Sequence, residues 1–171
     1  MNSAPSRIAA VVGVDSRIVQ ELFAALVADW RASGGHVVGL IGEANDLPNR
    51  TCRAGTLRDI VSGEPYPIFL DTAQSDTSCL VDAAGVEAAA AAILPQVSTS
   101  DLVVLSKFGK VEATHRGLAA VFEAAIAANK PVLTSVSDKH RDAWWDFAPG
   151  AVSLAADKSA IQNWWHSLGT G

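Results

Sequence analysis

The sequence predicts an α/β fold with a mainly parallel sheet and helices on both faces. The unbroken apolar run Leu102–Leu105 is typical of a central parallel strand that is covered on both sides. Shorter β-type runs at 8–12 and 36–41 enclose a helical pattern and so form a strand–helix–strand unit. With 171 residues, of which 49% are hydrophobic, we expect one domain over 1–171, with 1–7 flexible.

The first predicted helix follows the strand at 8–12. It carries apolar residues at helical spacing, namely Ile18, Leu22, Leu26 and Trp30, and we expect these to face the core. Asp15 or Ser16 is the predicted N-cap, and the glycine pair at 34–35 ends the helix.

The turn before this helix reads GVDSRIVQ and lacks the phosphate-binding pattern GxxxxGK[ST]. Gly13 alone does not supply the usual run of main-chain amides, and Asp15 places a negative charge where a phosphate would approach the helix. Arg17 compensates only in part. The turn therefore disfavours ordinary magnesium-dependent nucleotide hydrolysis and is interpreted as a capped, structural helix start.

A long polar segment at 42–63 is predicted to cross the carboxyl edge of the sheet. Its positive charges are Arg50, Arg53 and Arg58, which belong either to a binding site or to a solvated loop face. A small added hairpin is predicted around its end, from Leu57, Ile60, Ile68 and Leu70 and from the turn signals Ser62-Gly63, Pro65 and Pro67.

The remaining chain continues the alternation of helices and strands. Helices are predicted at 83–94, with Asp82 as N-cap, at 118–129 and at 157–168, a parallel strand at 132–136 and a short apolar segment at 151–154. Two WW pairs, at 144–145 and 164–165, are interpreted as a cover over the core. The alternative is a partner-binding surface, which an exposed patch at Trp144 or Trp165 would favour.

The segment after the central strand carries a concentration of charge. Ser106, Lys107, Gly109, Lys110 and Glu112 follow the carboxyl end of that strand, where open α/β sheets bind their ligands. The two lysines either meet a small anion or form an internal ion pair with Glu112 or Asp101.

Composition and charge argue against some classes of binding partner. The formal net charge of −5 argues against a general nucleic-acid binder. No apolar run approaches the roughly 18 residues of a membrane span, and no secretory signal is visible, so we expect a cytoplasmic protein without membrane insertion. Cys52 and Cys79 are expected to be reduced thiols that pack as small hydrophobes; the alternative is that they ligate a soft metal ion.

Five segments, spread from about Ile8 to Trp165, carry a family resemblance: CLVDAAGVEAAAAAI, DLVVLSKFGKVEATHRGL, KPVLTSV, AWWDFAPGAVSL and NWW. Together they resemble an uncharacterised bacterial domain family encoded near molybdate-uptake and nitrogenase genes, in which the most specific segment usually reads NKFGKxExxGRGL. This chain departs from that pattern at Ser106, which replaces Asn, and at His115, which replaces Gly. Leu80 stands where a basic residue often follows the cysteine.

A more distant similarity is to the small P-loop nucleoside-triphosphatases. VVLSKFGKVE resembles their strand ending in DEIGxME, and RAGTLRDIVSG resembles their RxGFxxxxLxTG segment. Ser106 and Lys107 occupy the two acidic positions, while Gly109 and Glu112 persist. The resemblance implies a P-loop-NTPase-like three-layer architecture with an added hairpin, whose magnesium-binding acids and phosphate-binding lysine are replaced.

The basic residues and the family resemblance together predict a small-anion binding or molybdenum-handling accessory protein, with molybdate or tungstate as ligand and no magnesium nucleotide. The predicted ligand-binding residues are Lys107, Lys110, Arg116, Arg50, Arg53, Arg58, Ser106 and Gly109. A non-enzyme is preferred. Two alternatives stay open: a nucleoside-triphosphatase-like hydrolase with Glu112 as base, and a partner-binding subunit of molybdenum or nitrogenase machinery. A homo-oligomer and a protein partner in molybdenum handling also stay open.

Overall fold

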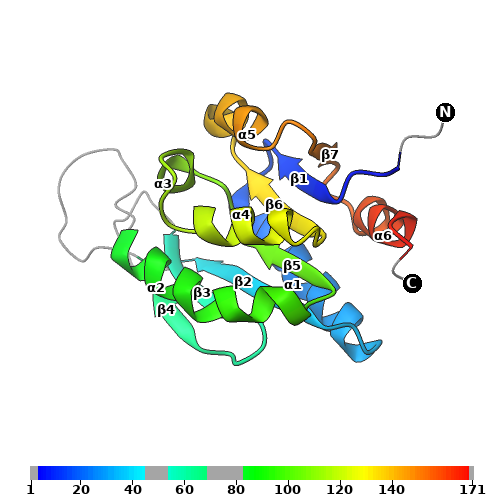
Figure 1. Ribbon diagram of the computed structural model, residues 1–171, viewed down its shortest axis with the longest axis horizontal. Coiled ribbons are helices and arrows are strands. Elements are labelled where there is room, and N and C mark those ends of the chain that lie inside the picture. Colours follow the sequence, from blue (N-terminus) through cyan, green and yellow to red (C-terminus); the bar gives the residue numbers. More distant parts are fainter. Residues whose placement is uncertain (1–3, 45–53, 69–82, 170–171) are drawn as a thin grey trace.

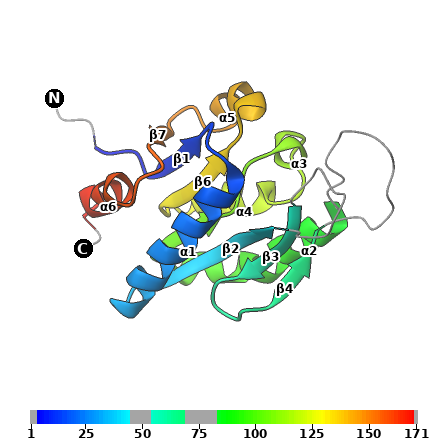
Figure 2. The same cartoon turned by 180° about the vertical axis from the view of Figure 1, so that it is seen from behind.

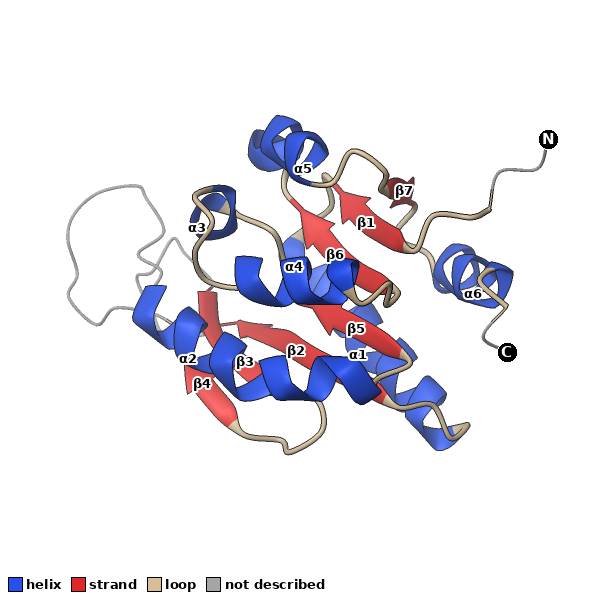
Figure 3. Ribbon diagram, in the orientation of Figure 1, coloured by secondary structure: helices blue, strands red, loops and turns tan. Residues whose placement is uncertain are grey.

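The computed structural model of the protein describes residues 4–44, 54–68 and 83–169. Its strands are β1 (Ile8–Val12), β2 (Val37–Ala44), β3 (Ala54–Asp59), β4 (Pro65–Pro67), β5 (Leu102–Leu105), β6 (Val132–Val136) and β7 (Val152–Leu154). Within the described residues they form one sheet in the order β4-β3-β2-β5-β6-β1-β7 (Figures 1 and 3). The strands from β2 to β7 in this order pair in parallel, while β3 and β4 add an antiparallel hairpin at one edge.

Helices cover both faces of this sheet. They are α1 (Ser16–Ala32), α2 (Ala83–Ile93), α3 (Lys110–Ala113), α4 (Ala119–Ala127), α5 (Arg141–Phe147) and α6 (Lys158–Ser167), with 3₁₀ turns η1 (Leu94–Thr99) and η2 (Asp138–His140). One apolar cluster joins α2, α4 and α5 to the sheet, and a second joins α1 and α6 to its other face (Figures 1 and 2). The predicted three-layer α/β architecture with an added hairpin is confirmed.

The central strand and its neighbours follow the predicted pattern closely. All four residues of β5 are buried, as a strand covered on both faces requires. The predicted bounds 8–12 and 132–136 match β1 and β6. β2 runs to Ala44, beyond the predicted end at Ile41, because its last residues pair with β3 of the hairpin.

The apolar face of α1 differs from the predicted one. Ile18 is 56% exposed, whereas the residues that pack on the sheet are Val19, Phe23, Leu26, Val27 and Trp30. Apolar residues occupy neighbouring positions on this helix, so the sequence allows two overlapping apolar faces. In the structure, the face that includes Val19 packs on the sheet. Asp15 is the N-cap, as predicted, and its side chain accepts a hydrogen bond from the Arg17 amide at 2.9 Å.

The tryptophans cover the core as predicted. Trp144 is completely buried among aromatic rings, 5.2 Å from Phe108 and 5.8 Å from Phe122 between ring centroids. Trp165 is 7% exposed and packs against Trp30, with 5.9 Å between ring centroids. The exposed tryptophan patch that would favour a partner-binding surface is thus not found at these two residues.

The chain makes fixed contacts from Ser6 onward, inside the segment predicted to be flexible. The main-chain oxygen of Ser6 accepts a hydrogen bond from the Trp164 indole at 2.8 Å, and that of Arg7 accepts one from the Val132 amide at 2.8 Å. These bonds tie the N-terminal segment to α6 and β6. Across the part of the chain described here, no helix is both long and apolar enough to cross a bilayer.

Candidate functional site

Three loops lie side by side at the carboxyl edge of the sheet, because the strands that lead into them, β5, β6 and β1, are neighbours. The Phe108 amide donates to the Ser135 oxygen at 2.9 Å, and Phe108 forms a parallel bridge with Val136. On the other side, the Gly13 amide donates to the Val136 oxygen at 2.8 Å. The loop after β6 therefore lies between the loop after β5 and the turn after β1.

Four basic side chains gather on the first two of these loops. We call them the lysine cluster: Lys107 and Lys110 from the segment after β5, and Lys139 and His140 from η2. The positive charge of Lys139 lowers the pKa of Lys107, and the charges of Lys139, Lys107 and Lys110 add to the effect of burial in lowering the pKa of His140. Lys139 is thus close enough to Lys107 to repel it, and all three lysines are close enough to His140 to act on its charge.

Lys107 is a lysine of the cluster whose pKa is lowered by its surroundings. It keeps exposed area at the surface, but protein atoms displace part of the water around its ammonium group, and this burial is the main cause of its lowered pKa. Glu112 attracts the ammonium and opposes the shift, yet the two do not approach within ion-pair distance. Asp101 is engaged elsewhere, since its carboxylate accepts from the His36 amide at 2.8 Å. The internal ion pair considered from the sequence does not form.

Among the described residues, no carboxylate lies within 4 Å of the ammonium groups of Lys107, Lys110 or Lys139. Glu112 attracts the Lys107 ammonium more strongly than Lys139 repels it, but it does so without forming an ion pair. The three ammonium groups are therefore free of a contacting acid in the described part of the chain, and an anion bound between the two loops would meet them directly.

Glu112 acts as the support of the first loop. It is 4% exposed, and its two carboxylate oxygens accept hydrogen bonds from the amides of Gly109, at 2.9 Å, and Leu118, at 3.1 Å. Burial raises its pKa, while these amides and Lys107 act in the opposite direction. Gly117 has φ +60°, and a Cβ there would collide with this carboxylate. Such an arrangement favours a structural role over that of a catalytic base.

The main chain at Ser106 is held from two sides. Its oxygen accepts a hydrogen bond from the Gln20 amide group at 2.7 Å and one from the Ser135 hydroxyl, also at 2.7 Å. Gln20 in turn accepts from the Gly42 amide at 2.8 Å, so a single buried side chain of α1 joins the ends of β2 and β5. This network fixes the point from which Lys107 projects.

Two of the predicted arginines are already paired at the surface. Arg58 on β3 forms an ion pair with Glu43, whose pKa is lowered mainly by the hydrogen bond from this guanidinium. Arg116 pairs with Glu87 of α2 at 3.1 Å. Across residues 4–44, 54–68 and 83–169, no hydrogen bond or ion pair joins either arginine to the lysine cluster, and their role as ligand-binding residues stays a prediction. Arg50, Arg53, Cys52 and Cys79 lie outside the described residues, and no group of three or more potential metal ligands is found among the residues described.

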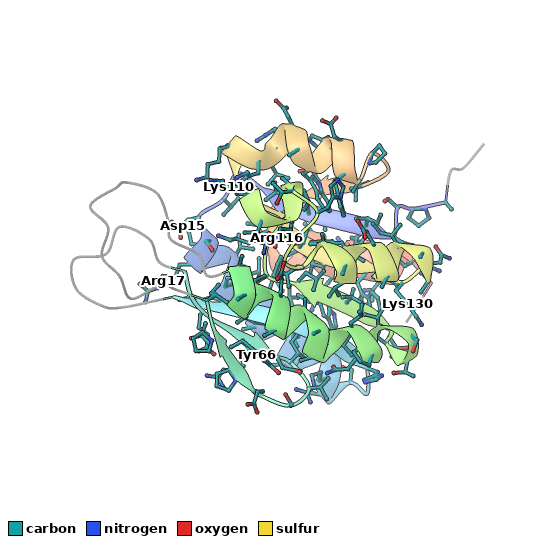
Figure 4. All side chains as sticks on the ribbon, turned by 60° about the vertical axis from the view of Figure 1, so that its left-hand side comes forward. Asp15, Arg17, Tyr66, Lys110, Arg116 and Lys130 are labelled. Carbon is teal, nitrogen blue, oxygen red and sulfur yellow. The ribbon has the colours of Figure 1, made fainter. Side chains whose placement is uncertain are left out.

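Lys139 and His140 are members of the cluster that the sequence did not single out. The available signal was their position directly after β6, at the same edge of the sheet as Lys107. The His140 Nδ1 atom and the Ser137 hydroxyl are hydrogen-bonded at 2.9 Å, which orients the imidazole. Figure 4 shows Lys110 and Asp15 on the same side of the molecule, with Lys130 at the opposite end.

Residues 8–164 match the family described as "Protein of unknown function (DUF2478)". The chain belongs to this family. It is also 31% identical over 164 residues to the protein named "Molybdenum import ATP-binding protein ModC 2" from Bradyrhizobium diazoefficiens. The alignment covers 94% of this chain but only 18% of that relative, so the chain spans less than a fifth of the relative's length.

The fold of this DUF2478 member is similar to the solution structure of a human cancer-related nucleoside triphosphatase. The TM-score is 0.55, with 95% of this chain and 92% of the other chain covered, at 16% sequence identity. The likeness confirms the predicted P-loop-NTPase-like fold.

Two carboxylates lie at the β1–α1 turn of this DUF2478 member, one from the turn itself and one from η2. Gly13 has φ +75°, and the Asp138 carboxylate faces it so closely that a Cβ on Gly13 would lie 2.8 Å from Asp138 Oδ1. Asp15 caps the helix, and Arg141 forms an ion pair with Asp138. The carboxyl edge thus carries the carboxylates of Asp15 and Asp138 beside β1, the second offset in part by Arg141, and the lysine cluster between β5 and β6.

Proposed function

We propose that the lysine cluster binds a small dianionic oxyanion of the molybdate or tungstate type, and that the protein acts as an accessory protein in molybdenum handling. The observation that carries the proposal is the convergence of Lys107, Lys110 and Lys139 without an ion-paired carboxylate among the described residues. Ammonium groups form charge-assisted hydrogen bonds to oxyanions without a bridging metal ion.

The choice of anion is supported by the relative whose name begins with molybdenum import, since the alignment with it covers nearly the whole chain. The physical demands of such an anion also agree with the site. A tetrahedral dianion needs several donors that converge from different directions, and the two loops supply ammonium groups from two neighbouring strands. Ser106, whose main chain is fixed by Gln20, sets the distance of Lys107 from η2.

Nucleotide binding at an altered site is the second candidate, because the fold is similar to that of a nucleoside triphosphatase. The carboxylates of Asp15 and Asp138 at the β1–α1 turn argue against it, since they oppose the approach of phosphate to the start of α1. A hydrolase would also need a base, and both oxygens of Glu112 are occupied by main-chain amides.

Calorimetric titration tests the proposal. The purified protein is titrated at fixed salt with molybdate, tungstate, sulfate, and ATP with magnesium. We expect saturable binding of molybdate or tungstate, and about ten-fold or greater weakening in Lys107→Ala and in Lys139→Ala, because each removes a charge-assisted hydrogen bond.

Lys130→Ala is the matched control, since it removes the same charge at the opposite end of the molecule (Figure 4). We expect its affinity to stay within about two-fold of wild type, because a distant surface charge is screened by salt. Equal affinity in wild type, Lys107→Ala and Lys139→Ala would refute the proposal. Binding of magnesium-ATP with turnover would favour the second candidate.

A further inference from the structure

The lysine cluster alone does not explain how a compact oxyanion is distinguished from a polyphosphate. Any anion is attracted by ammonium groups that form no ion pair, and the phosphate chain of a nucleotide carries more charge than molybdate. Selectivity therefore requires a feature that penalises the longer anion. Among the described residues, Asp138 carries a negative charge next to the cluster, facing Gly13.

Asp138 precedes Lys139 and His140 in η2, yet its carboxylate faces the opposite side of the loop. It lies against the Cα of Gly13, with Oδ1 2.8 Å and Oδ2 3.2 Å from the position of a Cβ on that glycine. It also forms an ion pair with Arg141 at the surface, which offsets part of its charge. One short loop thus presents ammonium and imidazole groups towards β5 and a carboxylate towards β1.

The β1–α1 turn offers little to a phosphate even apart from this carboxylate. The Gly13 amide is used by the Val136 oxygen, at 2.8 Å. The Arg17 amide, in the first turn of α1, is used by the side chain of Asp15, at 2.9 Å. Two donors that could meet an anion here are therefore satisfied within the protein, and Asp15 adds a second negative charge.

Compact oxyanions and polyphosphates differ in how far they extend from the lysines towards the β1–α1 turn. β1 and β5 are both neighbours of β6, so their loops lie two strand spacings apart, roughly 10 Å. A tetrahedral oxyanion is compact enough to stay on the β5–β6 side. A triphosphate that is anchored on the lysines extends across the end of β6 and brings its remaining charge towards Asp138 and Asp15.

We propose that Asp138 is a specificity-determining residue, whose carboxylate closes the β1–α1 turn to polyphosphates and so restricts the lysine cluster to compact oxyanions. The proposal rests on the proposed function for the identity of the preferred anion. The exclusion of polyphosphate depends only on the position of Asp138 beside Gly13, and it can be measured separately.

The test compares inorganic triphosphate and molybdate as titrants of four proteins. They are wild type, Asp138→Asn, the double variant D15N/D138N, and Asp146→Asn as control. Asparagine keeps the size of the side chain, and at position 15 it also keeps helix capping. Asp146 is exposed on α5, so its substitution changes the net charge equally without altering the β1–α1 turn.

We expect Asp138→Asn to bind triphosphate at least ten-fold more tightly than wild type, with a further gain in the double variant, while molybdate affinity changes less than three-fold. The control should change neither affinity by more than two-fold. An equal gain for both anions in Asp138→Asn, or no gain for triphosphate, overturns the inference. Circular dichroism of each variant verifies that the fold is retained.

The two proposals fail in different ways. If wild type binds no molybdate or tungstate but Asp138→Asn gains triphosphate binding, the proposed function is refuted and the exclusion by Asp138 stands. If wild type binds molybdate and Asp138→Asn gains nothing for triphosphate, the function stands and the role of Asp138 is refuted.

Discussion

Glu112 accepts a hydrogen bond from the main-chain amide of Gly109 at 2.9 Å, and this bond joins the start of the charged loop to a buried carboxylate. The second oxygen of Glu112 binds the amide of Leu118, just before α4. Gly109 is the N-cap of α3, and Glu112 is the third residue of that helix, which is one half of a capping box. The position of Lys110 between them therefore depends on this side chain.

Glu112→Ala is expected to reduce the free energy of unfolding by about 2–6 kcal/mol, because two buried amides lose their acceptor at about 1–3 kcal/mol each. Equilibrium unfolding in urea measures the change. Glu123→Ala is the control: Glu123 is exposed and only approaches His115, so a change within about 0.5 kcal/mol is expected. Similar losses in both variants would contradict a special role for Glu112.

The same carboxyl gives the stability a defined dependence on pH. Because burial raises the pKa of Glu112 above 4.5, the folded protein binds this proton more tightly than the unfolded chain does. The contribution of Glu112 is then fully present below pH 4.5 and decreases as pH rises through the folded pKa. We expect the stability difference between wild type and Glu112→Ala to be larger near pH 4.5 than at neutral pH. If the stability difference between wild type and Glu112→Ala instead increases with pH, the pKa of Glu112 is not raised in the folded protein.

Anion affinity should increase as pH falls through the pKa of His140. This pKa lies below 6.5 because of burial and the neighbouring lysines, so His140 is mainly neutral at pH 7, and a bound anion favours its protonation. Binding at pH 7 therefore takes up protons. Calorimetric titration with molybdate in two buffers of different ionisation enthalpy measures the number of protons taken up. We expect His140→Ala to reduce it; an unchanged value would exclude His140 as the group involved.

The sequence indicates Lys107 and Lys110 because they directly follow a continuous apolar strand, and that local pattern is sufficient to place them at the carboxyl edge. It does not indicate Lys139 and His140, since their contribution depends on β6 lying next to β5. Strand order is set by the packing of the whole sheet and is not visible in either segment.

The sequence also does not reveal that two of the predicted ligand-binding arginines form ion pairs with glutamates distant in the chain. Charge and proximity in sequence place Arg116 in the predicted site, but its partner, Glu87, is 29 residues away on α2, whereas Arg116 lies in the turn between α3 and α4. Arg58 and Glu43 meet across the β2–β3 pairing, at a separation of 15 residues. An ion pair of this kind depends on the register between elements, which a single sequence does not reveal.

His115 occupies a backbone conformation that favours glycine, which is the residue that the resemblance described above places at this position. Its φ is +60°, and its side chain is exposed. A left-handed conformation costs a non-glycine residue about 1–2 kcal/mol. We therefore expect His115→Gly to increase the free energy of unfolding by about 0.5–1 kcal/mol, after the entropy that glycine adds to the unfolded chain is subtracted.

The matched substitution at this position is His115→Val, because a β-branched residue tolerates positive φ poorly. It should destabilise the protein relative to wild type, so the three residues rank Gly, His, Val in decreasing stability. Urea unfolding of the set gives the order directly. If valine equals glycine, the backbone conformation at residue 115 does not limit stability.

Gly39 shows how closely the strands that lead to the site approach each other. It lies on β2 with φ +133°, and a Cβ there would overlap the main-chain oxygen of Val104 on β5. Gly34 also has a positive φ, +93°, but no atom lies within 4 Å of its Cβ position. Alanine at either position therefore has the strain of a positive φ, but only at position 39 would its Cβ also overlap main-chain atoms.

We expect Gly34→Ala to cost about 1–2 kcal/mol, from the left-handed conformation alone. Gly39→Ala should cost more than about 4 kcal/mol or prevent folding, because a main-chain oxygen in a parallel pair moves only if β2 and β5 separate. Thermal unfolding and the yield of folded protein measure both. A loss in Gly39→Ala no larger than that in Gly34→Ala would mean that β2 and β5 adjust their spacing to accommodate the added Cβ.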